Sequence, residues 1–235
     1  MRNSYIVYII FVFHFSCTNS ETKLFEKLSS FRTGIDFENN LTFKEDFNIF
    51  TYRNYYNGGG VGLGDINNDG LLDIYFTSNL NKNKLYLNKG DFQFEDITDV
   101  AGVGGEKSWS TGVSLADINA DGFLDIYVSN SGDIKGDNKQ NELFINNGDL
   151  TFTEMAKEYG LDDKGYSTHA AFFDFDRDGD LDCYLLNNSY KGGFRITSIG
   201  KDQRPVRDEV GGDKLFENDN GKFIDISEEA GIYGS

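Results

Sequence analysis

The chain has 235 residues, and its 39 acidic and 22 basic side chains give a formal net charge of −17. Nucleic acids and anionic membrane surfaces attract clustered Lys and Arg, so this charge argues against either as a partner. Two cysteines exclude a disulfide scaffold, whereas 38% apolar residues are enough to bury a hydrophobic core.

Residues 1–16 are typical of a secretory signal peptide. A weakly positive start precedes the apolar and aromatic run 5–15, which is too short to cross a membrane as a helix. Ser16 and Cys17 resemble the cleavage box of bacterial lipoproteins, in which the cysteine becomes the lipidated N-terminus. We therefore expect export, with one of two outcomes. Either Cys17 carries a lipid anchor, the only membrane contact of an outer-membrane or cell-surface lipoprotein, or an ordinary signal peptide is cleaved and the protein is secreted.

Residues 17–24 are expected to be a linker, and residues 25–50 form an N-terminal segment. Phe25, Leu28, Ser29 and Gly34 follow the order of apolar, small and glycine residues that closes each of three repeats further along the chain. Propellers often close their ring with a terminal strand. The segment is therefore a candidate outer strand for a blade whose other strands lie beyond Ser235. The alternative is that it only continues the linker.

The rest of the chain consists of three related units, residues 51–104, 105–161 and 162–235. Each has an acidic nine-residue segment, preceded by alternating small and apolar residues and followed by short β-rich runs without a helical period. Four short strands that recur roughly every 50 residues are typical of propeller blades. The sequence therefore predicts an all-β fold, a partial β-propeller of about three four-stranded blades. The insertion 189–212 is expected to be a surface loop in the third blade.

The three acidic segments have the composition of calcium-binding loops. In each one, side-chain oxygens stand at positions 1, 3, 5 and 9, glycine stands at position 6, and position 7 can offer a main-chain carbonyl. Ca²⁺ takes 6–8 oxygen ligands, so the three loops predict about three calcium ions. The candidate ligands are Asp65, Asn67, Asp69, Leu71 and Asp73 in the first loop, Asp117, Asn119, Asp121, Phe123 and Asp125 in the second, and Asp174, Asp176, Asp178, Asp180 and Asp182 in the third.

Two other interpretations of these loops were weighed. An EF-hand needs a glutamate at position 12, but Phe76, Val128 and Leu185 stand there, and the flanking residues are typical of strands. A polar Asp/Asn/Gly turn without a metal is the second alternative. Three copies in register argue against that alternative.

Residues 55–65, 109–113 and 169–174, together with the acidic loops, resemble the FG-GAP or VCBS repeats of integrin-α-type propellers. The chain is also similar to bacterial secreted proteins related to cartilage acidic protein, the ASPIC/UnbV-associated family. The resemblance implies a calcium loop between the first two strands of each blade. The amides of Asn67 and Asn119 then imply weaker binding there than in the third loop. Because three blades cannot close a ring, we expect the chain to be an N-terminal fragment.

No catalytic site is expected. His169 should lie near the propeller axis and Trp109 could stack on a ligand such as a sugar, but a structural role is favoured for both residues. No Ser or Cys partner for His169 is suggested by the sequence. We therefore expect a non-enzymatic, calcium-binding propeller that acts in adhesion or ligand binding at the cell surface, with a protein or a glycan as ligand. The alternative is the N-terminal, non-catalytic part of a larger polysaccharide-active enzyme.

Overall fold

The computed structural model describes residues 24–52, 54–107, 109–132, 138–188 and 207–232. Cys17, the expected signal peptide and residues 189–206 of the insertion lie outside these ranges. Within the described ranges, no helix combines the length and the apolar character that a membrane span requires.

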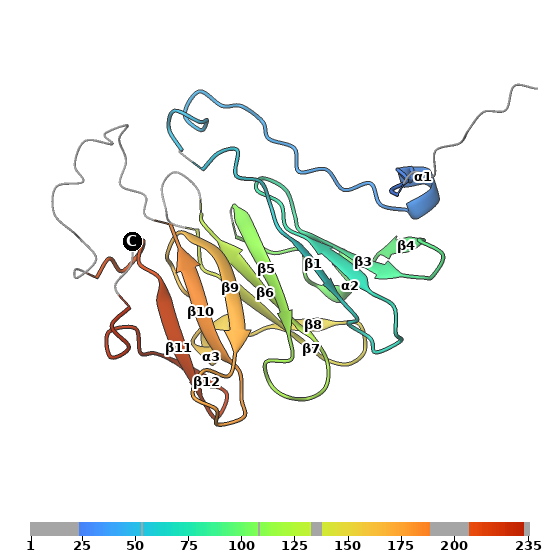
Figure 1. Cartoon of the computed structure of the whole chain (residues 1–235). Coiled ribbons are helices and arrows are strands. Elements are labelled where there is room, and N and C mark those ends of the chain that lie inside the picture. Colours follow the sequence, from blue (N-terminus) through green and yellow to red (C-terminus); the bar gives the residue numbers. More distant parts are fainter. Residues whose placement is uncertain (1–23, 53, 108, 133–137, 189–206, 233–235) are drawn as a thin grey trace, which may run out of the picture.

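The described strands form three four-stranded antiparallel sheets that lie side by side (Figure 1). In each sheet the strands are neighbours in chain order, so that one repeat supplies one blade. The first blade contains β1 (Val61–Gly64), β2 (Asp73–Phe76), β3 (Lys84–Asn88) and β4 (Phe94–Asp96). The second contains β5 (Ser110–Ala116), β6 (Asp125–Asn130), β7 (Glu142–Asn146) and β8 (Phe152–Glu154). The third contains β9 (Ser167–Phe173), β10 (Asp182–Asn187), β11 (Lys214–Asp219) and β12 (Lys222–Asp225). This arrangement confirms the predicted all-β fold with a partial propeller.

The inner strands of neighbouring blades approach each other closely, and β5 lies beside both β1 and β9. A Cβ atom on Gly60 would lie 2.7 Å from the carbonyl oxygen of Thr111, and one on Gly112 would lie 2.4 Å from that of Thr168. No side chain fits at either position. The small residues before each acidic loop are therefore required because the backbones of adjacent blades crowd together.

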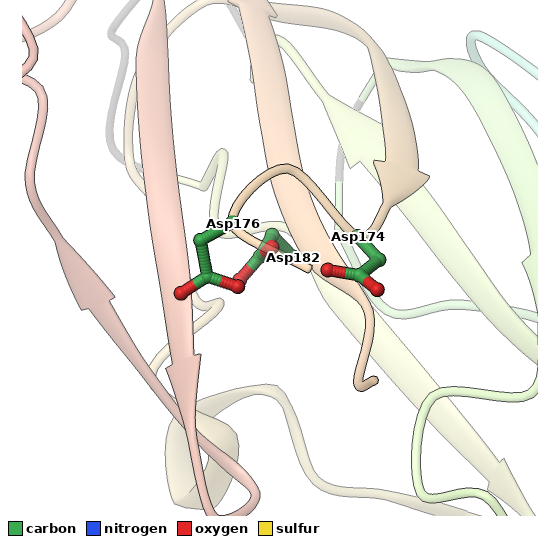
Figure 2. A group of neighbouring side chains, drawn as sticks. All are labelled: Asp174, Asp176 and Asp182. Carbon is green, nitrogen blue, oxygen red and sulfur yellow. The ribbon is translucent and has the colours of Figure 1, made fainter. Parts of the chain in front are cut away.

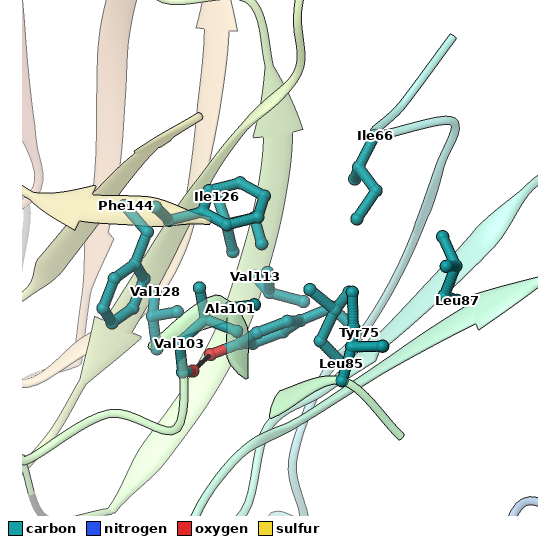
Figure 3. Close-up of a cluster of buried hydrophobic side chains, with 12 residues drawn as sticks. Ile66, Tyr75, Leu85, Leu87, Ala101, Val103, Val113, Ile126, Val128 and Phe144 are labelled. Atoms are coloured by element: carbon teal, nitrogen blue, oxygen red, sulfur yellow. Dashed lines mark hydrogen bonds between the residues drawn. The ribbon is translucent and has the colours of Figure 1, made fainter. Parts of the chain in front are cut away.

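Two hydrophobic cores fill the spaces between the blades. The first contains Tyr75 and Leu85 from the first blade, packed against Val113 and Ile126 from the second (Figure 3). The hydroxyl of Tyr75 donates a hydrogen bond of 2.6 Å to the carbonyl oxygen of Val103, as Figure 3 shows, so that this buried phenol is satisfied. The second core joins the second and third blades, and Cys183 is buried in it as a small apolar residue.

A single helical turn follows the outer strand of the first two blades, and a similar turn stands near the N-terminus. These turns are α1 (Ser30–Thr33), α2 (Thr98–Ala101) and α3 (Ala156–Tyr159). The glycines that end them, Gly34, Gly102 and Gly160, have φ values of +76°, +75° and +82°. A residue in this left-handed region closes a helix by bonding its N–H back to the last turn, and glycine adopts the conformation without a steric cost.

The outer strand is held by one recurring bond. The hydroxyl of Thr98 accepts the N–H of Leu85 on β3 at 2.9 Å, and the hydroxyl of Ser227 accepts that of Leu215 on β11 at 2.9 Å. The second blade has Ala156 at this position. There, the carboxylate of Glu154 accepts the N–H of Leu143 at 3.3 Å instead.

The described strands do not test the predicted pairing of the N-terminal segment. Among residues 24–52 the structure has α1 but no strand, and the expected outer strand around Phe25 is not paired with any described sheet. The segment then runs across one end of the blades (Figure 1). There, Phe47, Tyr52 and Tyr55 surround Trp109 in a separate aromatic cluster. Ring closure by residues 25–50 thus stays a prediction.

Candidate metal sites

The three acidic loops join the first two strands of each blade, which excludes the helical flanks of an EF-hand. Position 9 of each loop begins the second strand and pairs with the residue that precedes position 1, as in Gly64 with Asp73, Ala116 with Asp125 and Phe173 with Asp182. All three loops therefore lie at corresponding ends of the blades.

Each loop contains two residues in the left-handed region of the backbone. At position 4, Asn68, Ala120 and Arg177 have φ values of 60°, 57° and 70°. At position 6, Gly70 and Gly122 have φ values of 86° and 93°, and Gly179 has 103°. A Cβ atom on these glycines would meet nothing within 4 Å, so that conformation, not space, explains the glycine at position 6.

In the first two loops, main-chain N–H groups point at the position 1 carboxylate. Asp65 accepts the N–H groups of Asp69 at 3.1 Å and Gly70 at 2.8 Å. Asp117 accepts the corresponding groups of Asp121 and Gly122, both at 2.9 Å. The chain is thereby wrapped around the position 1 carboxylate.

The first two loops differ from the third in having an amide side chain at position 3. The side-chain nitrogen of Asn67 donates to the carboxylate of Asp69 at 3.0 Å, and that of Asn119 donates to Asp121 at 2.8 Å. These hydrogen bonds stabilise the ionised carboxylates but leave their charge unchanged. Among the described residues, Asp65, Asp69 and Asp73 do not form a close carboxylate triad.

In the third loop, position 3 is Asp176, which has no proton to donate when ionised. Carboxylate oxygens of Asp174, Asp176 and Asp182 all lie within 4.8 Å of one another, and Figure 2 shows the three side chains converging. One buried oxygen of Asp180 has no hydrogen-bond partner among the described residues. Burial raises the pKa of Asp180, and the nearby charges of Asp178 and Asp182 raise it further.

Asp178 does not belong to this triad, and its main-chain N–H donates to Asp176 at 3.1 Å. The position 7 residues were expected to offer main-chain carbonyls. Their N–H groups are fixed by the position 5 carboxylates, as in Leu71 to Asp69 at 2.8 Å and Phe123 to Asp121 at 2.9 Å. Their role as ligands stays a prediction.

The position 9 aspartates have a structural role that the sequence did not reveal. Asp73, Asp125 and Asp182 are buried, and each carboxylate accepts two main-chain N–H groups. For Asp125 the donors are Ile118 in the loop at 2.9 Å and Asn146 on β7 at 2.9 Å. Each carboxylate thus ties its loop to the third strand. A carboxylate has about four lone-pair sites, so these oxygens can still bind a metal.

Burial changes the acidity of two of these groups. It raises the pKa of Asp73, and it raises the pKa of Asp125 to about 6. The main-chain hydrogen bonds oppose this effect, whereas the charges of the other acids in the same loop add to it. A cation beside the carboxylate would favour its ionised form.

A recurring asparagine on the third strand also positions the loops, and the sequence analysis did not assign it a role. Asn88, Asn146 and Asn218 donate to the carbonyl oxygen at position 8 of their loop, at 2.8, 3.1 and 3.2 Å. Asn146 additionally donates to the carbonyl oxygen of Ile66 in the first blade at 2.8 Å. The only available signal was its recurrence three residues after Leu85, Leu143 and Leu215.

Among the described residues, neither His169 nor Trp109 is part of a catalytic arrangement. Trp109 is fully buried in the aromatic cluster, so packing is its role and it cannot stack on a ligand in this conformation. His169 is exposed on β9, beside a shallow groove of about 350 Å³ along the inner strands. Ser114 also lines this groove, but its hydroxyl donates to the carbonyl of Ala170 at 2.5 Å.

Comparisons with known proteins agree with this architecture. A family model of FG-GAP-like repeats matches residues 65–128 and 131–185. Cartilage acidic protein 1 of Xenopus tropicalis is 33% identical over 155 residues, which cover 63% of this chain and 23% of that protein. Its human counterpart is 30% identical over 167 residues, 71% of this chain and 24% of that protein. The chain thus spans about a quarter of the length of these relatives.

A solved structure of an Agrocybe aegerita lectin that recognises non-reducing terminal N-acetylglucosamine covers 70% of this chain and 36% of its own, with 19% identity and a TM-score of 0.34. A TM-score this low is not evidence of a shared fold. The family model matches more than half of the residues, and its matched ranges contain all three acidic loops. This chain therefore belongs to the FG-GAP-like repeat family.

Proposed function

We propose that the chain is a calcium-binding, non-catalytic propeller segment of an exported protein that binds a protein or a glycan at the cell surface. The observation that carries the proposal is the triad of Asp174, Asp176 and Asp182, whose oxygens lie within 4.8 Å of one another. Like charges this close repel each other unless a proton or a cation lies between them. Calcium suits the site because its ligands are all oxygens on a flexible loop.

The proposal includes an order of affinity. In the first two loops, calcium must displace the side-chain bond from Asn67 to Asp69, or from Asn119 to Asp121, before both side chains turn their oxygens to the ion. In the third loop there is no such bond to break, and its five aspartates carry two more negative charges than the three of each other loop. We therefore expect the third loop to bind calcium most tightly.

Calcium bound in this way would stabilise whole blades. The position 9 aspartate that would ligate the ion also accepts a main-chain N–H from the third strand, as Asp182 does from Asn218 at 2.9 Å. An ion in the loop would therefore link the first three strands of its blade. A ligand that binds only the folded state raises its stability, by about 2.7 kcal/mol per site at a hundred times the Kd.

Ligand binding without catalysis is supported by what surrounds the one described histidine. His169 lies near Ser114, but the hydroxyl of Ser114 is committed to a main-chain carbonyl. The net charge of −17 disfavours nucleic acid as the partner. Cell-surface attachment through Cys17 is part of the proposal and rests on the sequence alone. Mass spectrometry of the exported protein tests it, because Cys17→Ser should abolish a lipid adduct.

Thermal melting tests the calcium proposal. The metal-free chain should melt at a lower temperature than the same chain in excess calcium, and magnesium should have a smaller effect. Asp176→Asn should remove a large part of the calcium-dependent increase. Glu229→Gln makes the same change of charge at an exposed position outside the loops and should leave the increase unchanged. Melting temperatures that do not respond to calcium, or an equal loss in both variants, would refute it.

A further inference from the structure

Two hydrogen-bonded links join the acidic loop of the first blade to that of the second. The first link is the side chain of Asn68, at position 4 of the first loop. Its nitrogen donates to the carbonyl oxygen of Gly122, at position 6 of the second loop, at 3.0 Å. The N–H of Gly122 donates to Asp117 at 2.9 Å, so that this glycine is held at both of its main-chain groups. The first loop thus helps to fix the glycine at which the second loop turns.

The second link is the side chain of Asn146 on β7. Its nitrogen donates to the carbonyl oxygen of Ile66, at position 2 of the first loop, at 2.8 Å, and to that of Leu124, at position 8 of the second loop, at 3.1 Å. The main-chain N–H of the same asparagine donates to the position 9 carboxylate of Asp125 at 2.9 Å. Asn146 and Ile66 are both buried. One buried residue therefore contacts both loops at once.

Both links reach the first loop at residues that stand between candidate ligands. Asn68 lies between Asn67 and Asp69, and Ile66 lies between Asp65 and Asn67. A cation that gathers the ligands of this loop would therefore also fix the residues that hold the second loop. Hydrogen-bond networks carry coupling between sites in this way, because ordering one partner reduces the entropy that the other must still lose.

The second and third loops are not linked in this way within the described ranges. Position 4 of the second loop is Ala120, whose side chain has no donor. Asn218 is the counterpart of Asn146 in the third blade. Its side-chain nitrogen donates to the carbonyl oxygen of Leu181 in its own loop at 3.2 Å and, among the described residues, to none in the second loop. The third loop is therefore separate from the other two in its hydrogen bonds.

We propose that the first two loops bind calcium as a cooperative pair, coupled through Asn68 and Asn146, and that the third loop binds it independently. This inference rests on the proposed calcium sites. An ion in either loop of the pair raises the affinity of the other, and the effect is reciprocal. Couplings between sites are commonly about 5- to 150-fold in affinity. We expect about five- to tenfold here, because an exposed bond such as that of Asn68 contributes little.

The cooperative pair gives calcium uptake a characteristic order. The third loop fills first, because its carboxylates bind most tightly. The other two loops then fill together, so that chains with one ion and chains with three ions are abundant while chains with two ions are scarce. Independent loops would instead fill one after another, or at random, and chains with two ions would be common.

Native mass spectrometry tests the coupling in a chain whose third loop is emptied by Asp174→Asn and Asp176→Asn. The two remaining loops have the same side-chain ligand types at each position, so their intrinsic affinities are similar. At half saturation, independent binding leaves at least about half of the chains with one ion, whereas fivefold coupling lowers that share to about a third. We expect the lower share. A share of half or more would overturn the coupling and leave the proposed calcium sites standing.

Two alanine variants, made in that chain, test the route of the coupling. Asn68→Ala should raise the share of singly loaded chains, and Asn220→Ala should leave it unchanged. Both replace an exposed asparagine in the left-handed region, at φ values of 60° and 53°, but only Asn68 joins two loops. Ala120 has a φ of 57° at the same position of the second loop, so alanine is accommodated there. An equal response of the two variants would overturn the proposal.

A complementary chain tests the independence of the third loop. Asp65→Asn and Asp69→Asn empty the first loop, and the second and third loops remain. At half saturation at least about half of these chains should carry one ion, because no link joins the two loops. A share of about a third would overturn the proposal while leaving the calcium sites in place. If neither chain takes up calcium, the proposed function fails together with this inference.

Discussion

Replacing Asn146 with alanine should destabilise the chain more than the equivalent replacement of Asn88. Both side chains donate to a carbonyl oxygen of their acidic loop and accept the N–H of a glycine in the following hairpin. Only Asn146 also donates to the carbonyl oxygen of Ile66 in the neighbouring blade, at 2.8 Å. The difference between the two variants therefore isolates the bond that joins two blades.

The size of the loss in unfolding free energy depends on which polar groups lose their hydrogen-bond partner. Ile66 is only 1% exposed, so its carbonyl oxygen is buried and loses this partner in Asn146→Ala. A buried main-chain group left without a partner costs about 1–3 kcal/mol, whereas a bond at the exposed hairpin contributes about 0.5–1.5 kcal/mol. We expect a loss of about 3–5 kcal/mol for Asn146→Ala and about 1–3 kcal/mol for Asn88→Ala, a difference of about 2 kcal/mol.

Urea unfolding at a fixed calcium concentration provides the measurement. The midpoint should fall further for Asn146→Ala, with the same slope in both variants, because the surface exposed on unfolding is unchanged. Equal destabilisation of the two variants would contradict the reasoning, because it would mean that the bond to Ile66 adds nothing to the stability of the interface between the blades.

Three further predictions concern the loops and the core. Asn67→Asp should raise the calcium affinity of the first loop about tenfold, and Asp176→Asn should lower the affinity of the third loop by a similar factor. Titration calorimetry measures both affinities. Unchanged affinities would argue against both loops as calcium sites. Because burial raises the pKa of Asp125 from 3.8 to about 6, its ionised form costs about 3 kcal/mol at pH 7 in the metal-free chain. This cost is absent below the unfolded pKa and grows as the pH rises through the folded one. The melting temperature of the metal-free chain should therefore rise as the pH is lowered from 7 to 5. The melting temperature of the calcium-loaded chain should fall over the same change, because protons compete with the ion. A metal-free melting temperature that falls would contradict this prediction. Tyr75→Phe should cost about 1–3 kcal/mol in urea unfolding, because it leaves the carbonyl of Val103 without its 2.6 Å bond, and a cost near zero would mean that water replaces the hydroxyl.

The blades could be predicted from the sequence because their determinants are local. A run such as Ile74 to Phe76 has strand propensity by itself, and the repetition of each landmark multiplies a weak signal by three. The small residues around Gly60 and Gly112 were also expected, since alternation of small and apolar residues marks strands that lie close together. The order of the strands then follows from the short connections between them.

The single-turn helices were missed because four residues cannot show a helical period. α2 and α3 are recognisable only from the glycines that end them, Gly102 and Gly160, whose left-handed conformation the sequence alone does not show. Residues 25–29 were expected as a strand because of the spacing of Phe25, Leu28 and Ser29, and they are not helical. They match the sequence of β12, but the third strand that would pair with them is not among the described residues.

The hydrogen bonds that support the acidic loops could not be predicted from the sequence, for a different reason. Asn146 binds the main chain of Ile66, which lies 80 residues earlier, and a main-chain partner leaves no trace in the sequence. The second role of Asp125 was hidden in the same way, because its partners are N–H groups that every residue carries. Sequence spacing identified the residues of the loops and the amides of Asn67 and Asn119. The structure adds the bonds that these amides donate to Asp69 and Asp121, and the convergence of three carboxylates in the third loop.

The number of calcium ions bound by the native chain tests the central claim most directly. Native mass spectrometry of the desalted protein, titrated with calcium, should show three ions per chain, and the first to bind should be lost when Asp174, Asp176 and Asp182 are all replaced by asparagine. A chain that binds no calcium, or that binds the first ion equally well after this replacement, would contradict the account.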